Sequence, residues 1–547
     1  QDSAMPFSAK SRIRPFDKSA DGTLIGEGAA AVVLKRLEDA KQDGDRIYAV
    51  LKGVGTAVAG ECSETQLSQG AYSAALEQVC RDASITPDQV SYLETSGSGI
   101  QQQDQVEAQA LGEFFGKKAS DTPCYVGSVK ADVGHAGAAS GLASLVKTAL
   151  CLDRQILPPL RNVETLRYEW IRGRRKFMLP AGPQYWLRNR ACGPRRALVS
   201  SVGVDGSCSH ALLESFVDSS ARANANIVDR PLGAFDEGLF ALFADSAQGL
   251  LDKIIELKAF VAVRETASID QLAAEWFSKN EDQSTSLCLA LVAGDSDELL
   301  EQLEFAATSL RESPEKPLGA NGLPNLSAAA RDRVFYNPQP LASSGKLAFV
   351  FPGSGNHFPA MGRELSARWP SVFARQDQRS EFLADQYQPE HFWTSQLHES
   401  IYEDHNALVI SHVALCTALS DLVRSFGVEP QAVSGYSLGE SSGLFSSDAW
   451  LDRDGMLRRL RKSTLFTEDL GGECKAAGKV WKRPAGKRVE WILGIVDAPA
   501  EMVRQKLTGK DRAYLLIINT YKECVIGGDR QQVEQLVQEL GCHFIQL

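Results

Sequence analysis

The sequence lacks the features that would place it in a membrane, on nucleic acid or in an oxidising compartment. No apolar run reaches the ~18 residues that a membrane span needs. Acidic residues outnumber basic ones, and the net charge of -11 argues against nucleic acid or an anionic membrane as the main partner. The 11 cysteines are scattered, without a C-x-x-C pair or metal-ligand spacing. We therefore expect a cytoplasmic protein with free thiols, no metal and no nucleic acid or membrane partner.

A recognisable secretion signal is also missing, but the chain begins at Gln1 rather than Met, so this absence carries no weight. One basic cluster departs from the acidic character: residues 172–176 together with Arg188, Arg190, Arg195 and Arg196. It is either a solvated linker face or a docking surface for an acidic carrier protein.

A length of 547 residues predicts several domains, and the pattern divides the chain into three zones. Residues 1–218 alternate short apolar runs with helical patterns, which predicts a layered α/β domain. Residues 219–345 contain amphipathic helices, one apolar strand and a Pro/Gly/Asn-rich stretch, as expected for an α/β linker domain. Residues 346–547 form the third zone. The chain is thus predicted to be an α/β multidomain protein.

The end of the third zone has its own pattern. From about residue 488 the order of predicted elements is strand, helix, strand, strand, helix, strand. This order is that of the split-βαβ, ferredoxin-like motif. We expect residues 488–547 to form a ferredoxin-like subdomain.

Ser437 is the strongest candidate for a nucleophile. It lies in the sequence G-Y-S-L-G (residues 435–439), between a predicted strand and a predicted helix. A G-x-S-x-G turn in this position holds the serine on a tight elbow, and the helix behind it offers unpaired N–H groups to a developing oxyanion.

The third zone resembles the malonyl/acyl-CoA:acyl carrier protein transacylases of fatty acid and polyketide synthases. The resemblance rests on F-V-F-P-G-S-G (residues 349–355), G-Y-S-L-G-E (residues 435–440) and the ferredoxin-like insert. It implies an α/β-hydrolase-like acyltransferase in which Ser437 is acylated. The backbone N–H groups of Leu438 and Ser354 would form the oxyanion hole. Ser354 stands where the family has Gln.

The resemblance also implies substrate-binding residues and a general base. Asn519 opens N-T-Y-K-E-C-V-I-G-G, which is similar to the family's N-x-P-x-Q-x-V-I-S-G segment; a plain turn asparagine is the alternative. The carboxylate-binding arginine falls on Arg461 or, without gaps, on Lys462. We prefer Arg461, because a guanidinium binds a carboxylate bidentately, although an exposed helix cation is equally compatible. The catalytic histidine is expected beyond Leu547.

The first zone resembles the ketoacyl synthases. Four segments keep register with that family: R-P-F-D (residues 14–17), Y-L-E-T-S-G-S-G (residues 92–99), G-S-V-K-A-D-V-G-H (residues 127–135) and S-S-V-G-V-D-G up to His210 (from residue 200). The resemblance implies the C-terminal part of a thiolase-like layered domain. Condensing enzymes of this family also pair as dimers, so a homodimer through this domain is expected.

The chemistry implied for the first zone is incomplete. Ser96 stands where the family has the first of two catalytic histidines, whereas Lys130 and His135 match the family. The nucleophilic cysteine would lie before Gln1, and Cys62 is misplaced for it. Ser96, Lys130 and His135 are therefore predicted to be a vestigial ketosynthase site without condensation activity.

The order of ketosynthase-like domain, linker and acyltransferase resembles polyketide synthases and, most closely, the acyltransferase subunits of bacterial polyunsaturated fatty acid synthases (PfaB type). The implied reaction moves an acyl group from CoA through Ser437 to the phosphopantetheine of an acyl carrier protein, with other synthase subunits as partners and no further cofactor. Two alternatives remain: a thioesterase-like hydrolase and a non-catalytic scaffold of a synthase complex.

Overall fold

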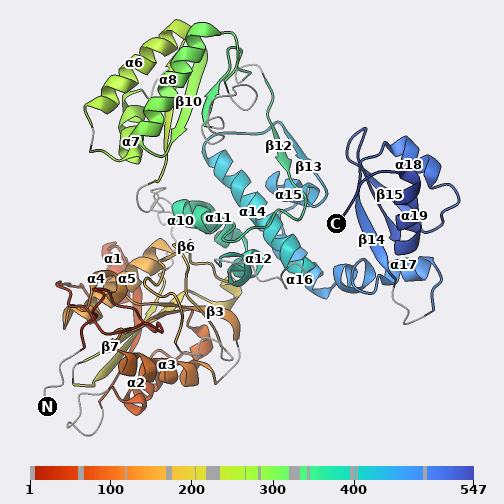
Figure 1. Ribbon diagram of the computed structural model, residues 1–547. Helices are drawn as coiled ribbons and strands as arrows, with labels where there is room; N and C mark the ends of the chain where they lie inside the picture. Colours follow the sequence, from red (N-terminus) through yellow and green to blue (C-terminus); the bar gives the residue numbers. More distant parts are fainter. Residues whose placement is uncertain are drawn as a thin grey trace.

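The computed structural model describes residues 6–58, 67–117, 120–167, 175–203, 205–216, 235–264, 266–280, 285–318, 333–341, 345–394, 401, 404–484 and 489–547. These residues form four bodies, which follow one another along the chain (Figure 1). The predicted boundaries at residues 218/219 and at about 488 lie outside the described residues.

The first zone is built around a six-stranded sheet with the order β1-β8-β7-β2-β3-β5. Strands β2, β3, β5 and β7 run parallel to one another. Strand β8 is added antiparallel at the β7 edge, and β1 in turn pairs antiparallel with β8. The strands are β1 (Val50–Ala57), β2 (Tyr92–Glu94), β3 (Ser120–Gly127), β5 (Arg175–Met178), β7 (Arg196–Val202) and β8 (Cys208–Glu214).

Helices cover both faces of this sheet. On one face, α2 (Gln69–Asp82) and α3 (Gln101–Phe115) bury their apolar sides against the strands in one large core. On the other face, α5 (Ala139–Arg154) packs Cys151 and Leu152 against a second core. The result is three layers, helix, sheet and helix, as predicted for residues 1–218.

The linker body is a separate α/β unit. Its three-stranded antiparallel sheet has the order β11-β10-β9 and forms one core with α6, α7 and α8. The elements are β9 (Gly238–Ala244), α6 (Ala247–Ala262), α7 (Ile269–Lys279), β10 (Leu287–Ala293), α8 (Ser296–Glu312) and β11 (Val334–Tyr336). The helices and the apolar strand expected from the sequence are all present.

The third zone begins with a small parallel sheet. Strand β12 (Ala348–Phe351) pairs with β13 (Ala432–Gly435), and these are the only two strands of that sheet among the described residues. An α/β-hydrolase-like domain has a larger sheet, so that part of the expectation is not met. Helices make up most of the rest: α10 (Arg363–Arg368), α11 (Pro370–Arg379), α12 (Leu383–Tyr387), α13 (Pro389–Phe392), α14 (His405–Ser425), α15 (Gly439–Ser446), α16 (Arg453–Lys462) and α17 (Lys475–Val480).

Helix α14 forms the centre of this helical body. Within the described residues it is the one helix long and apolar enough to cross a membrane, by length and composition only. Most of that apolar stretch, 61%, is buried inside the protein. Its side chains pack against α11 and α12 in a shared core, so its apolar character is explained by packing.

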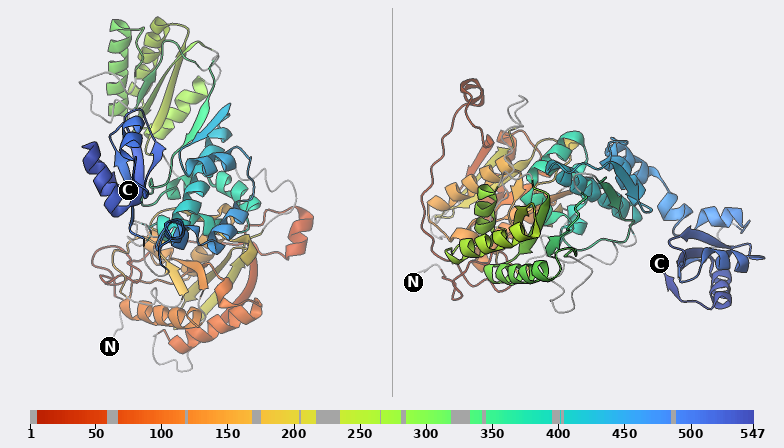
Figure 2. Two further views of the ribbon diagram at one scale, coloured as in Figure 1. Left: turned by 90° about the vertical axis from the view of Figure 1, so that its right-hand side faces the viewer. Right: turned by 90° about the horizontal axis from the view of Figure 1, so that it is seen from above.

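The last body is a four-stranded antiparallel sheet with the order β15-β16-β14-β17. Its elements follow in the order expected from the sequence: β14 (Trp491–Val496), α18 (Ala500–Lys506), β15 (Ala513–Ile518), β16 (Cys524–Asp529), α19 (Arg530–Leu540) and β17 (Phe544–Gln546). Figure 1 and the right-hand view of Figure 2 show this body at one end of the molecule, and in Figure 1 the labelled helices α16 and α17 lead to it.

Part of the basic cluster lies at the contact between the first and third zones, which we call the seam. Arg195 is almost completely buried, and Arg195 and Arg188 share the carboxylate of Asp377 on α11, at 3.5 and 3.0 Å. The expectation of a uniformly solvated or docking face is therefore wrong for these two arginines. The physical reason is that Asp377, 182 residues from Arg195, supplies a buried counter-charge. Most of residues 172–176 lies outside the described part of the chain.

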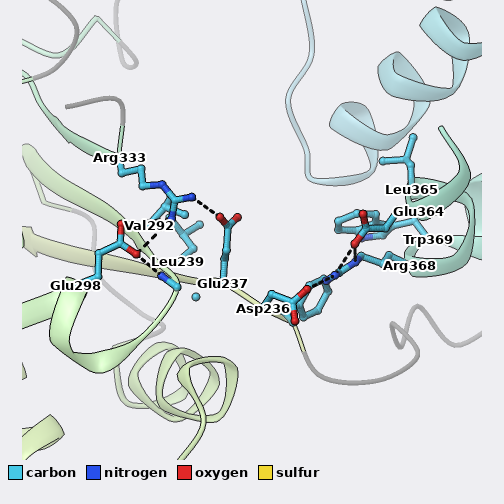
Figure 3. Close-up of a pocket in the computed structure, with 13 residues that line it drawn as sticks. Asp236, Glu237, Leu239, Val292, Glu298, Arg333, Glu364, Leu365, Arg368 and Trp369 are labelled. Carbon is cyan, nitrogen blue, oxygen red and sulfur yellow. Dashed lines mark hydrogen bonds and ion pairs between the residues drawn. The ribbon is translucent and has the colours of Figure 1, made fainter. Parts of the chain in front are cut away.

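A groove of about 890 Å³ separates the linker body from α10 (Figure 3). Two ion-pair clusters line it. Arg333 contacts Glu237 and Glu298 on the linker side, and Arg368 contacts Glu364 and Asp236 across the groove. None of the residues singled out by the sequence lines this groove.

Candidate functional site

The best-defined polar cluster lies at the carboxyl ends of two neighbouring parallel strands. Ser96 follows β2 and Lys130 follows β3, and β2 and β3 are paired in parallel. Ligands of open α/β sheets bind outside the carboxyl ends of their strands. The topology therefore brings together two residues that are 34 positions apart.

Lys130 and Ser96 are in direct contact. The Lys130 Nζ donates hydrogen bonds to the Ser96 carbonyl oxygen at 2.8 Å and to the Ser96 Oγ at 2.9 Å. Both residues are buried, with 4% and 6% of their surfaces exposed. Gly97 makes the close turn possible: its φ is +45°, and a Cβ there would lie 2.8 Å from the Ser128 Oγ.

Burial shifts the proton equilibrium of Lys130. Loss of solvation lowers the pKa of the Lys130 ammonium, and the negative charges of Glu107, Glu94 and Asp104 act in the opposite direction without outweighing it. Glu94 is already paired with Lys147 at 3.0 Å. The Lys130 amine is therefore easier to deprotonate than an exposed lysine.

Glu107 on α3 holds the loop that carries Ser96. Its carboxylate accepts hydrogen bonds from the backbone N–H groups of Ser96 at 2.8 Å and Gly97 at 2.9 Å, and from the Tyr72 hydroxyl at 2.7 Å. The sequence reasoning missed this residue. The sequence did contain an indication of its role. Glu107 and Asp104 lie three positions apart, on one face of a helix that begins just after the glycine-rich segment.

Asp104 ties a second segment to the same place. Its carboxylate accepts a 2.8 Å hydrogen bond from the backbone N–H of Phe16, within the R-P-F-D segment. Burial raises the pKa of Asp104 to about 7, and the charge of Glu107 adds to that effect. This residue was missed as well.

His135 lies close enough to Lys130 for their charges to interact. Burial, and then the charge of Lys130, lower the pKa of His135. The ring is therefore neutral near pH 7. The backbone N–H of Gly137 lies 3.2 Å from His135 Nδ1, and an acceptor role for Nδ1 places the proton on Nε2. The structure thus brings Ser96 and Lys130 into contact and places His135 near Lys130, whereas the vestigial character of this site stays a prediction.

The described thiol whose charge interacts with this cluster, that of Cys208, is not activated. Burial raises the pKa of Cys208, which interacts electrostatically with Glu107, to about 12. Cys62 lies outside the described residues. Nor does the described part of the chain contain a group of three or more His, Cys, Asp or Glu side chains able to hold a metal ion.

The serine elbow exists as local geometry. Ser437 has a φ of 52° in the turn between β13 and α15, and it is exposed. A Cβ on Gly439 would lie 2.2 Å from the Phe351 carbonyl oxygen, so glycine is required there. Leu438 immediately precedes α15, and the segment carrying Ser354 approaches Ser437 through Gly353. Among the described contacts, none joins Ser437 to a histidine.

The two residues expected to bind the substrate lie in different surroundings in the structure. Asn519 lies beside the elbow, because its Oδ1 accepts a 3.0 Å hydrogen bond from the Tyr436 hydroxyl. Arg461 instead pairs with Asp385 at 2.7 Å, and its side chain is 54% exposed. The ion-pair partner of Arg461 therefore lies on α12 and not at the elbow. The structure gives no support to the predicted role of Arg461 in binding the substrate carboxylate.

Comparison with known proteins shows what the first zone is similar to. Residues 1–40 match the family model "Beta-ketoacyl synthase, N-terminal domain", and residues 48–164 match "Beta-ketoacyl synthase, C-terminal domain". The second match contains Ser96, Glu107, Lys130 and His135. The first zone is therefore similar to the beta-ketoacyl synthases over these two segments, in agreement with the resemblance found in its sequence.

Individual relatives are similar over nearly the whole chain. The highly reducing polyketide synthase azaB of Aspergillus niger is 30% identical over 96% of this chain. The 5-methyl-1-naphthoate synthase of Streptomyces sahachiroi is 31% identical over 100% of it. The chain spans only 20% and 28% of the lengths of these two relatives. Among solved structures, the ketosynthase from module 6 of the bacillaene synthase from Bacillus subtilis 168 is 29% identical, with 56% of this chain and 52% of that chain covered and a TM-score of 0.37.

These matches overturn the function expected from the elbow. Both matching family models describe condensing enzymes, so the expectation of an acyl-CoA:acyl carrier protein transacylase acting through Ser437 is wrong. The thioesterase and scaffold alternatives receive no support either. The physical reason for the error is that a strand–serine–helix turn is a common local geometry, and a nucleophile also needs a base.

Proposed function

We propose that the first zone is the condensing, ketosynthase-type domain of a polyketide-synthase-type protein. It would join a malonyl-type extender on an acyl carrier protein to an acyl thioester, with release of CO₂. The observation that carries the proposal is the cluster at the carboxyl ends of β2 and β3, inside the segment that matches the ketosynthase model: buried Lys130 contacts Ser96, and the charge of Lys130 acts on half-buried His135.

The geometry supports the charge-stabilising half of this reaction. Loss of CO₂ from a malonyl thioester leaves an enolate whose negative charge sits on the thioester oxygen. A neutral His135 with its proton on Nε2 can donate a hydrogen bond to that oxygen. His135 is half-buried, and a partly desolvated donor is worth more than a donor in water because the local dielectric is lower.

The relatives' names support the polyketide class over polyunsaturated fatty acid synthesis. Ketosynthase domains of polyketide synthases work with acyl carrier proteins and other synthase modules, so we propose these partners, and a homodimer through the first zone. We also propose a cytoplasmic location and a ferredoxin-like fold for residues 489–547, which the strand order β15-β16-β14-β17 supports.

The test is decarboxylative condensation by the full chain. Malonyl carrier protein and an acyl thioester are supplied, and CO₂ release and ketoacyl product are measured together. His135→Ala should lower the rate about 100-fold, as expected for loss of a positioned donor. His405→Ala is the matched control, because His405 is an exposed residue at the start of α14. Wild-type product no greater than that of His135→Ala contradicts the proposal and supports the sequence-based expectation of a disabled site.

A further inference from the structure

We propose that Ser96, activated by Lys130, is an acyl-accepting nucleophile of this site. The inference rests on the proposed function only for the class of its substrate, an acyl thioester. Its basis is the direct contact between a serine hydroxyl and a buried lysine amine, 2.9 Å apart. Serine and lysine form a nucleophile–base pair in several unrelated enzyme folds.

The position of Ser96 suits a nucleophile. It lies in the loop after β2, the strand that is paired in parallel with both β3 and β7. The carboxyl-terminal ends of strands β2, β3 and β7 therefore lie side by side at this point of the sheet, where open α/β sheets bind their ligands. The loop is also held rigidly, because Glu107 fixes the backbone N–H groups of Ser96 and Gly97. A rigid loop keeps the Ser96 Oγ at 2.9 Å from the Lys130 Nζ.

The surroundings of Lys130 suit a base. A lysine can accept a proton only when its amine is neutral, and burial favours that form. Two of the three carboxylates that oppose this effect have other partners. Glu94 pairs with Lys147, and Glu107 accepts from two backbone N–H groups and the Tyr72 hydroxyl. The third, Asp104, has a pKa of about 7 and is partly protonated at neutral pH.

The step balances without any further reactant. In the structure Lys130 Nζ donates to Ser96 Oγ, so the reaction begins when this hydrogen bond reverses and Oγ donates to the neutral Nζ. The Ser96 oxygen then attacks the thioester carbonyl carbon while Lys130 Nζ takes the hydroxyl proton, forming a C–O bond and a tetrahedral intermediate. The C–S bond then breaks, and the departing thiolate takes the proton from the Lys130 ammonium and leaves as a thiol. Lys130 ends neutral, and the acyl group is held as an oxygen ester on Ser96. The Cys208 thiol does not compete for this role, since burial raises its pKa to about 12.

The experiment maps the adduct on the full chain. The protein is incubated with acetyl-N-acetylcysteamine, a small acyl thioester, and digested, and the acetylated peptide is identified by mass spectrometry. We expect the adduct on the peptide that contains Ser96. It should survive neutral hydroxylamine, which cleaves a cysteine thioester faster than an oxygen ester.

Variants separate the roles of the residues. Ser96→Ala should abolish the adduct, whereas Ser98→Ala, a buried serine of the same loop, should retain it. Lys130→Met should slow ester formation about 100-fold, the usual effect of losing a positioned base. If Lys130→Met does not fold, mapping of the wild-type adduct still decides the question.

Two outcomes overturn the inference: an acyl ester found only on other peptides, or an adduct of equal yield in Ser96→Ala. The inference and the proposed function fail separately. Release of CO₂ from malonyl carrier protein without an ester on Ser96 contradicts the inference alone. An ester on Ser96 without CO₂ release contradicts the proposed function alone.

Discussion

The Glu107 carboxylate lies 2.8 Å from the backbone nitrogen of Ser96 and accepts its hydrogen bond. Glu107 belongs to the buried side of α3, so a helix that packs the core also sets the position of the loop that carries the candidate nucleophile. This coupling makes the site sensitive to the packing of α3. A variant of Glu107 that loosens this loop should therefore also lower the stability of the protein.

Glu107→Gln should therefore destabilise the protein by about 1–3 kcal/mol, because one backbone N–H would face an amide NH₂ instead of an acceptor. The measurement is the midpoint of chemical denaturation, followed by fluorescence. Glu113→Gln is the control, since Glu113 is exposed on the same helix and should change the stability by less than about 0.5 kcal/mol. Equal midpoints for the two variants would show that Glu107 does not hold the loop.

Asp104 should make the stability depend on pH. Burial raises its pKa in the folded state to about 7, above the ordinary value of 3.8, so the folded state binds the proton more tightly than the unfolded chain. This contribution is fully present below about pH 4 and is lost as the pH rises toward 7. Asp104→Asn should flatten this part of the profile when free energies of unfolding are measured from pH 4 to pH 8. Parallel profiles for the wild type and the variant would contradict the assignment.

Asp377 should be a stabilising residue of the seam between the first and third zones. Asp377→Asn would leave two largely buried guanidinium groups, those of Arg188 and Arg195, without their shared carboxylate. The expected cost is about 3–5 kcal/mol, measured as a lower denaturation midpoint of the full chain.

The surface pair of Asp448 and Arg379 provides the matched control for that prediction. These two side chains lie 3.9 Å apart and are more than half exposed. Asp448→Asn should therefore cost less than about 1 kcal/mol. A loss no larger for Asp377→Asn than for Asp448→Asn would mean that the seam does not depend on its buried charges.

The sequence by itself determined the local elements and the ketosynthase-like segments. Apolar periodicity placed the strands and helices of residues 491–547, because side-chain spacing follows directly from the geometry of each element. Ser96, Lys130 and His135 were found from short segments whose order along the chain matches one family. The elbow at Ser437 was also found correctly as a turn, but its function was not, since a turn of five residues does not show whether a base stands beside it.

Only the tertiary structure decided which distant residues meet. The contact between Lys130 and Ser96 exists because β2 and β3 are parallel and end at the same edge of the sheet. Arg195 is buried because Asp377 offers it a counter-charge, and Arg461 turns to Asp385. Such pairings depend on the packing of elements far apart in the chain, and on the desolvation that packing imposes, and neither is encoded in local spacing.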